Sequence, residues 1–275
     1  MPMPDPMLIL QMLALLLVIG ALAGVLAGLL GVGGGIVLVP GFYYSFAALG
    51  YESGALMQVC LATSLATIIV TSARSVMAHH MRGAVEWPIL KTWAAGIVVG
   101  AVLGVLVAAS LRSATLQGIF GGLAFAIGLY MLFGRSEWRI AQAMPGLLLR
   151  SLLSPVVGFL SVLMGIGGGS FGVPIMTLHG VAIHRAVATA AGFGLIIALP
   201  SVIGFLFVDV PGAPPYTLGA VNIPAFLIVI AMTMTTAPLG VKLAHALDPK
   251  PLKRVFGVFL TLVALNMLRR SLGAG

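Results

Sequence analysis

Two glycine clusters have the clearest potential for chemistry in this sequence. They consist of Gly33, Gly34 and Gly35 in the first half and of Gly167, Gly168 and Gly169 in the second. Three consecutive glycines inside an apolar run should break a helix, because each costs roughly 1 kcal/mol relative to alanine. The next helix then begins with unpaired backbone amides and the partial positive charge of the helix dipole. Each cluster therefore predicts a seat for an anion.

A second interpretation of the clusters stays open. Small residues are common wherever membrane helices touch, so the glycines could simply allow close packing at a helix bend. The same proline follows both clusters, as Pro40 and Pro174, which points to a duplicated feature.

Hydroxyl side chains near the clusters could complete the shell around an anion. Thr63 and Thr189 occupy matching places in the two halves, each in an alanine-threonine pair. Further candidates are Ser64 and Ser170. Most hydroxyls in membrane helices bond back to their own helix, so core packing is the alternative for each of them.

Three basic residues complete the set of candidates: Arg74, Arg185 and Lys242. They fall toward the cytoplasmic ends of the expected spans, where long basic side chains commonly snorkel to the headgroups. From there they could also gather anions at the inner mouth.

Acidic residues are expected only in termini and loops, at Asp5, Glu52, Glu86, Glu137, Asp209 and Asp248. A chain without a carboxylate at mid-membrane is a poor carrier of metal or organic cations and has no carboxylate proton relay. The histidines lack the paired spacing of a metal site, and the single cysteine, Cys60, excludes an internal disulfide. We expect no metal and no cofactor.

The composition identifies an integral membrane protein. Of 275 residues, 60% are hydrophobic and 7% are charged, with a mean hydropathy of +1.17. Apolar runs near twenty residues recur along the chain, which is the length a helix needs to cross a bilayer. The net charge of +8 is spread over short loops, the pattern of membrane topology and not of nucleic-acid binding. These features predict an all-α polytopic membrane protein.

The two halves of the chain repeat each other in about five apolar segments each. Gly83-Ala84-Val85 matches Gly219-Ala220-Val221, and the match continues without a gap to Phe256-Gly257. The expected repeats span 1–134 and 146–275, joined by a cytoplasmic linker at 135–145. The expected segments are 7–30, 36–49, 56–78, 88–109 and 115–133, then 146–164, 170–178, 186–208, 223–246 and 252–268. Within them, two glycine ladders predict faces for close helix packing: Gly20, Gly24 and Gly28, and later Gly96, Gly100 and Gly104.

Charge asymmetry predicts that the repeats are inverted. Arg74, Arg82 and Lys91 flank one connection, whereas the matching connection around Asp209 has no basic residue. By the positive-inside rule the first is cytoplasmic and the second external, which puts both termini outside. Inverted repeats with broken helices at the centre are typical of secondary transporters. The short segments 36–49 and 170–178 could cross fully or re-enter from one side.

Several stretches together resemble one family. They are GLLGVGGGIVLVP, TSARSVMAHHMRGAVEWP, LMGIGGGSFGVPIM, LGAVNIPAFL and PLGVKLAHALDPKPLKRVFG. They resemble the TauE/SafE family of sulfite and organosulfonate exporters over nearly the whole chain. The resemblance implies a bacterial inner-membrane exporter of small sulfur-containing anions such as sulfite or sulfoacetate, without fixing the substrate.

The function expected from these observations is secondary transport of a small anion. An anion channel or facilitator is the alternative, because an amide-lined constriction could conduct without alternating access. An enzyme is not expected, since no nucleophile has a convincing activating partner. The expected partners are the small anionic substrate and membrane lipid, with no nucleic acid, and a homodimer is one oligomeric state the sequence leaves open.

Overall fold

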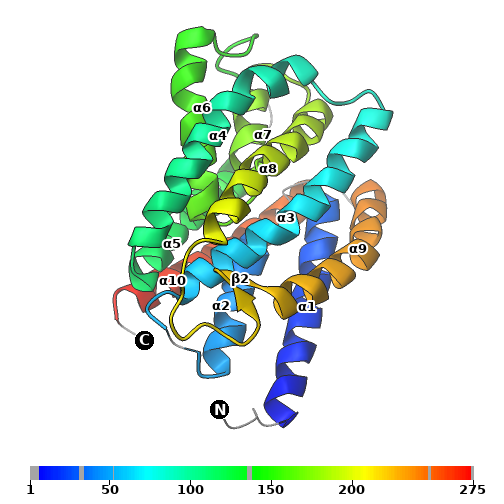
Figure 1. Cartoon of the computed structure of the whole chain (residues 1–275). Helices are drawn as coiled ribbons and strands as arrows, with labels where there is room; N and C mark the ends of the chain where they lie inside the picture. The colour runs from blue at the N-terminus through cyan, green and yellow to red at the C-terminus, as the bar shows by residue number, and fades with distance from the viewer. Residues whose placement is uncertain (1–5, 31–33, 52, 135–137, 247–248, 274–275) are drawn as a thin grey trace.

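A computed structural model describes residues 6–30, 34–51, 53–134, 138–246 and 249–273. Within these ranges the chain forms ten α-helices and one short β-hairpin (Figure 1). The first half holds α1 (Pro6–Leu30), α2 (Gly35–Ala48), α3 (Leu56–Met81), α4 (Trp87–Ser110) and α5 (Ser113–Phe133). The second half holds α6 (Leu147–Leu163), α7 (Gly169–Leu178), α8 (Ile183–Phe205), β1 (Thr217–Leu218), β2 (Val221–Asn222), α9 (Ile223–Ala246) and α10 (Pro249–Ser271).

The all-α polytopic architecture expected from the sequence is confirmed. Each helix begins and ends within three residues of an expected apolar segment. In the described ranges, six helices are long and apolar enough to cross a membrane: α1, α3, α4, α5, α8 and α9. The hairpin was not expected, and it lies directly before α9, with Thr217 paired to Asn222 and Leu218 to Val221.

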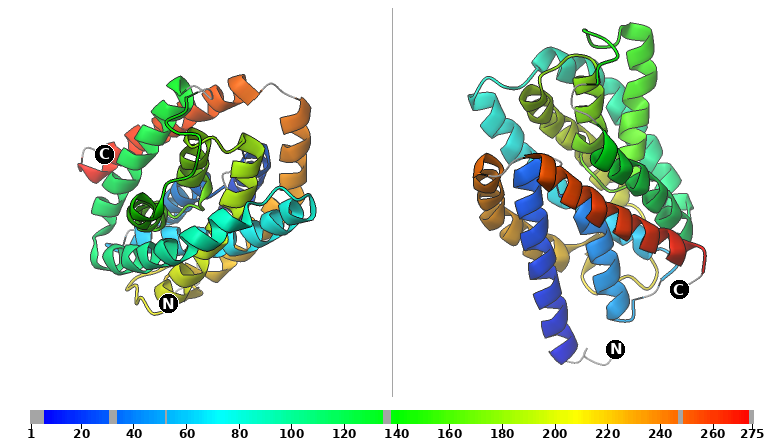
Figure 2. Two further views of the ribbon diagram at one scale, coloured as in Figure 1. Left: turned by 90° about the horizontal axis from the view of Figure 1, so that it is seen from above. Right: turned by 180° about the vertical axis from the view of Figure 1, so that it is seen from behind.

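Helices α3 and α8 form the centre of the bundle. The apolar stretch of α3 is 78% buried and that of α8 is 67% buried, whereas the other four long helices reach only 22–39%. The two helices pack on each other, and from above α7 and α8 lie inside a ring of outer helices (Figure 2, left). This position explains the polar residues of α3, because Gln58, Thr67 and Ser72 are buried against protein.

The outer helices are exchanged between the halves. α1 packs on α9, and α6 packs on α4, so the first helix of each half lies against the fourth helix of the other. The fifth helices of the two halves, α5 and α10, also pack on each other. In Figure 1, α1 rises from the N-terminus at the bottom while α6 descends from the top. This packing agrees with inverted repeats, which stay a prediction, as do the repeat boundaries.

Glycines allow close packing where outer helices of the two halves meet, between α1 and α9 and between α4 and α6. A methyl group on Gly20 would lie 3.0 Å from Cβ of Met232 on α9, and one on Gly24 would lie 2.8 Å from Cα of Thr233. On the other side, a methyl group on Gly104 would lie 2.8 Å from Cβ of Val162 on α6. Small residues let the backbones approach and gain dispersion contacts, which drive helix association inside a bilayer.

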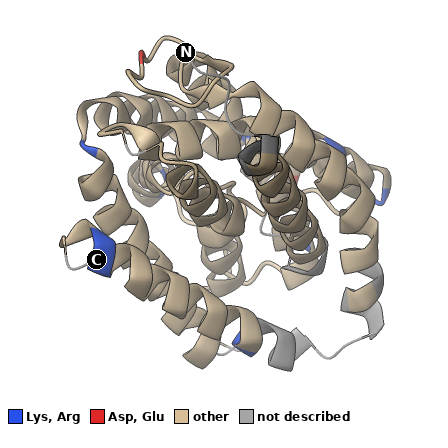
Figure 3. Cartoon of the chain, turned by 90° about the horizontal axis from the view of Figure 1, so that it is seen from below, with Lys and Arg blue, Asp and Glu red and all other residues tan. Residues whose placement is uncertain are grey.

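The two ends of the bundle carry different connections. Both termini lie toward the bottom of Figure 1, while the α3–α4 and α5–α6 connections lie toward the top. Viewed from below, charged residues occur at helix ends and connections, and the helical body between them is almost free of charge (Figure 3). The arrangement fits a bundle whose middle lies in lipid.

Two neighbouring glycines on α5 provide a test of this packing. A methyl group on Gly121 would lie 2.7 Å from Cγ of Leu268 on α10, whereas one on Gly122 meets nothing within 4 Å. We expect Gly121→Ala to destabilise the protein by roughly 1–3 kcal/mol through overpacking. Gly122→Ala should stabilise it by up to about 1 kcal/mol through helix propensity. Thermal unfolding of the purified variants in one detergent measures both, and equal melting temperatures would contradict the α5–α10 contact.

Candidate functional site

Both glycine clusters lie at breaks between helices. The first break separates α1, which ends at Leu30, from α2, which begins at Gly35, and the second separates α6 from α7 over residues 164–168. Gly33 lies outside the described residues. Gly34 has φ of 70° and Gly165 has φ of 60°, a left-handed backbone that glycine adopts without a side-chain penalty.

The two breaks touch each other at the centre of the molecule. A methyl group on Gly35 would lie 2.7 Å from the carbonyl oxygen of Gly165 and 3.0 Å from Cα of Ile166. Ser64 on α3 donates a hydrogen bond of 2.7 Å to that same carbonyl oxygen. The start of α2, the second break and α3 therefore meet at one place.

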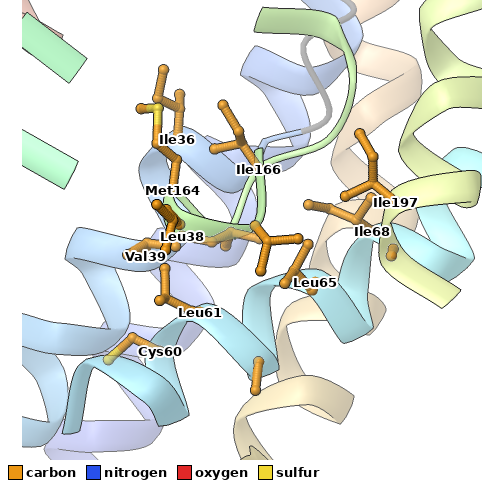
Figure 4. Close-up of a cluster of buried hydrophobic side chains, with 14 of the residues drawn as sticks. Ile36, Leu38, Val39, Cys60, Leu61, Leu65, Ile68, Met164, Ile166 and Ile197 are labelled. Atoms are coloured by element: carbon orange, nitrogen blue, oxygen red, sulfur yellow. The ribbon is translucent and has the colours of Figure 1, made fainter. Parts of the chain in front are cut away.

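Apolar side chains surround this meeting point. Figure 4 shows side chains of three parts of the chain pointing toward one another around the second break. They come from α2 (Ile36, Leu38, Val39), from the break itself (Met164, Ile166) and from α3 (Leu61, Leu65, Ile68). Such surroundings lower the local dielectric and strengthen any interaction between amide dipoles and an anion.

The start of α7 offers unpaired donors. Its first helical hydrogen bond runs from the amide of Gly172 to the carbonyl of Gly168, at 2.7 Å. The amides of Gly169, Ser170 and Phe171 have no backbone acceptor among the described residues. Three neighbouring donors at a helix N-terminus are the arrangement that binds oxyanions in many proteins.

The remaining glycines of the second break differ in how much space surrounds them. A methyl group on Gly168 would run into Phe193 of α8, so Gly168 is needed for close packing. A methyl group on Gly167 would lie 3.5 Å from Cγ2 of Ile68 and 3.6 Å from Cα of Gly194, which is ordinary contact distance. The sequence could not separate these two roles.

Thr63 and Thr189 make matching hydrogen bonds across the halves. The hydroxyl oxygen of Thr63 accepts the amide of Asn222 at 2.9 Å, and that of Thr189 accepts the amide of Glu86 at 2.9 Å. Asn222 and Glu86 directly precede α9 and α4. Each threonine of a central helix thus fixes the start of the other half's fourth helix, and neither bonds to a described glycine of the breaks.

Of the three basic candidates, Arg185 forms an ion pair and Arg74 is exposed. The Nε of Arg185 is 3.0 Å from Oε1 of Glu86, and this ion pair offsets the charge of Arg185. Arg74 is exposed near the end of α3. The side chain of Lys242 lies outside the described residues. A role for these residues in gathering anions stays a prediction.

The described acidic residues lie outside the helices, as expected. Glu86 directly precedes α4, and Asp209 belongs to the connection after α8. Asp5, Glu52, Glu137 and Asp248 lie outside the described residues. The described helical segments therefore contain no carboxylate to attract a cation.

The site is enclosed in this conformation. Every residue from 34 to 40 and from 161 to 170 is buried. Two hollows, of about 620 and 210 Å³, are lined by Tyr130, Trp138, Arg139, Ile140 and Leu178, and by residues of α3, α8, β2 and α9. Neither hollow is lined by a described residue of the glycine breaks.

Sequence reasoning missed three residues of this region. Asn222 and Glu86 donate their backbone amides to the hydroxyls of Thr63 and Thr189. The match between the GAV stretches of the two halves was the signal that could have found them. Ser161 is buried on the last turn of α6, beside the second break, and nothing in its sequence context marks it.

Comparisons with known proteins agree on one kind of function. A family model described as "Sulfite exporter TauE/SafE" matches residues 16–267. A "Probable membrane transporter protein" of Haemophilus influenzae is 32% identical over 255 residues, covering 92% of this chain and 97% of that protein. Another, of Methanocaldococcus jannaschii, is 29% identical over 266 residues, covering 94% and 96%. No solved structure matches the chain significantly.

The threonine contacts can be tested without a substrate. Thr63→Val leaves the buried amide of Asn222 without its acceptor, which should cost about 1–3 kcal/mol of stability. Thr63→Ser keeps the hydroxyl and should retain most of the stability. Thermal unfolding compares the two, with Thr189→Val and Thr189→Ser as the matching pair at Glu86. A valine variant as stable as its serine counterpart would show that the hydrogen bond contributes little.

Proposed function

Because the chain belongs to the TauE/SafE family of membrane transporters, we propose that it exports small sulfur-containing anions across the bacterial inner membrane. Sulfite, sulfoacetate and other organosulfonates are the proposed substrates. The observation that carries this proposal is the set of unpaired amides at the start of α7, which directly follows the buried second break.

The chemistry of this seat favours an oxyanion. Amide groups donate hydrogen bonds, and the helix dipole of α7 adds partial positive charge at the same place. A sulfonate or sulfite presents three oxygens, which match the three unpaired amides at Gly169, Ser170 and Phe171. A cation would find no carboxylate in the described helices, so its desolvation cost would have no compensation.

The burial of the seat favours a carrier over a channel. Residues 161–170, which include the second break, are all buried, and this supports a carrier that encloses its substrate. We propose that the substrate is enclosed between the halves and released by their relative movement, as in other transporters with broken helices. The negative cell interior favours outward movement of an anion by roughly 2.3 kcal/mol per charge per 100 mV.

The membrane topology is part of the proposal. The α3–α4 and α5–α6 connections, whose sequences contain Arg82 and Arg139, lie at one end of the bundle and both termini at the other. The α4–α5 connection with Arg112, and Arg269 and Arg270 near the C-terminus, are exceptions to this separation. The positive-inside rule supports a cytoplasmic face at the first end and external termini.

Counterflow in proteoliposomes tests the function directly. Vesicles loaded with unlabelled sulfoacetate should accumulate labelled sulfoacetate, with saturation and competition by sulfite, because a carrier exchanges substrate through one seat. Taurine, sulfate and thiosulfate complete the panel. Flux that rises linearly with concentration would favour the channel, and absence of flux for every sulfur anion would reject the substrate class.

A single methyl group can test whether the substrate uses the second break. Gly167→Ala adds a side chain at ordinary contact distance from its neighbours, so the fold should be kept. The methyl group should crowd the seat and raise the KM for counterflow roughly tenfold, which corresponds to about 1.4 kcal/mol. Gly122→Ala, at a glycine with open space around it, is the control. A normally folded Gly167→Ala variant with unchanged KM would place the substrate elsewhere.

A further inference from the structure

The second break is bordered by two buried hydroxyls without a partner. Among the described residues, five buried side-chain polar atoms have no hydrogen-bond partner, on Tyr44, Ser53, Gln58, Ser161 and Ser170. Ser161 is 0% exposed and lies on the last turn of α6, while Ser170 is 7% exposed and is the second residue of α7. Both therefore adjoin the same short loop at 164–168.

The local backbone ties both serines to the seat. The carbonyl oxygen of Ser161 accepts the amide of Ile166 at 3.0 Å, which holds the break against the end of α6. Ser170 lies in the first turn of α7, between two other residues whose amides are unpaired. The helix ends on the two sides of the second break thus hold unpaired amides and an unpaired hydroxyl on α7, and an unpaired hydroxyl on α6.

Two other buried serines inside helices pair their hydroxyls with the previous turn. Ser201 donates to the carbonyl of Ile197 at 2.6 Å, and Ser154 donates to the carbonyl of Arg150 at 2.8 Å. Bonding back to the previous turn is the ordinary solution for serine in a helix. Buried polar groups without a partner are uncommon in proteins, so two at one helix break call for an explanation.

The first half of the chain has no serine at the positions that match Ser161 and Ser170. At the offset that aligns the glycine clusters, Ser161 corresponds to Ala27 and Ser170 to Ile36. Ile36 is buried among the apolar side chains around the meeting point (Figure 4). The first break is therefore apolar where the second is polar, although both have the same glycines.

We propose that Ser161 and Ser170 are substrate-binding residues that donate hydrogen bonds to oxygens of the transported anion, which sits against α6 and α7 and not symmetrically between the breaks. This assignment rests on the proposed function and narrows it. The seat selects oxyanions, with at least two oxygens for the two hydroxyls, over spherical halides of the same charge. The start of α2, with the buried Ile36, serves as the apolar wall of the seat.

The proposal predicts opposite effects on binding and on stability. Without substrate the hydroxyls have no partner, so Ser161→Ala and Ser170→Ala should keep or raise the melting temperature of the empty protein. Each should weaken binding of sulfite or sulfoacetate about tenfold, and the double variant should weaken it further. Ser201→Ala removes a satisfied hydroxyl, so it should keep wild-type affinity and have an equal or lower melting temperature.

The experiment combines thermal unfolding and isothermal titration of the full chain in detergent, with sulfite, sulfoacetate and chloride as probes. The expected result is a selective loss of sulfite and sulfoacetate binding in the two variants, with no loss of stability. If the wild type binds neither sulfur anion, the proposed function fails and this assignment fails with it. If the wild type binds and both variants bind equally well, the assignment alone is wrong. Variants that melt well below Ser201→Ala would show a structural role and also overturn it.

Discussion

The close approach of Gly35 to the Gly165 carbonyl is the constraint on which the rest of the structure depends. No side chain fits between the start of α2 and the second break, so the two halves can only meet there with glycine at position 35. Ser64 holds the Gly165 carbonyl from α3, which sets the position of the central helix. The amides at the start of α7 are free because the first residues of a helix have no intrahelical acceptor.

Much of the fold could be predicted from the sequence because lipid imposes simple rules on it. A span must be apolar and about twenty residues long, so the apolar runs predicted every helix to within three residues. The same rules say nothing about which helices pack together. The contact of α1 with α9 depends on how glycine faces such as Gly20 and Gly24 meet a partner far along the chain.

The candidate site was only partly predictable for a related reason. The glycine breaks follow from local helix propensity, which a sequence reveals directly. The partners of Thr63 and Thr189 lie 159 and 103 residues away, and no local pattern announces such a contact. The distinction between Gly168, which packs on Phe193, and Gly167, which has room beside it, exists only once α8 is in place.

The exchange of outer helices between the halves constrains how the protein can be made. A nascent chain that has been synthesised only as far as α5 holds a glycine face on α1 whose cover, α9, has not yet been translated. The same is true of the α4 face that α6 will occupy. Insertion can proceed helix by helix, but assembly has to wait until α9 and α10 have been made. The contacts are therefore strongly non-local, which slows folding. Until then the exposed small-residue faces are open to unintended helix partners, so chaperoning within the membrane would matter more for this protein than for a bundle built from neighbours.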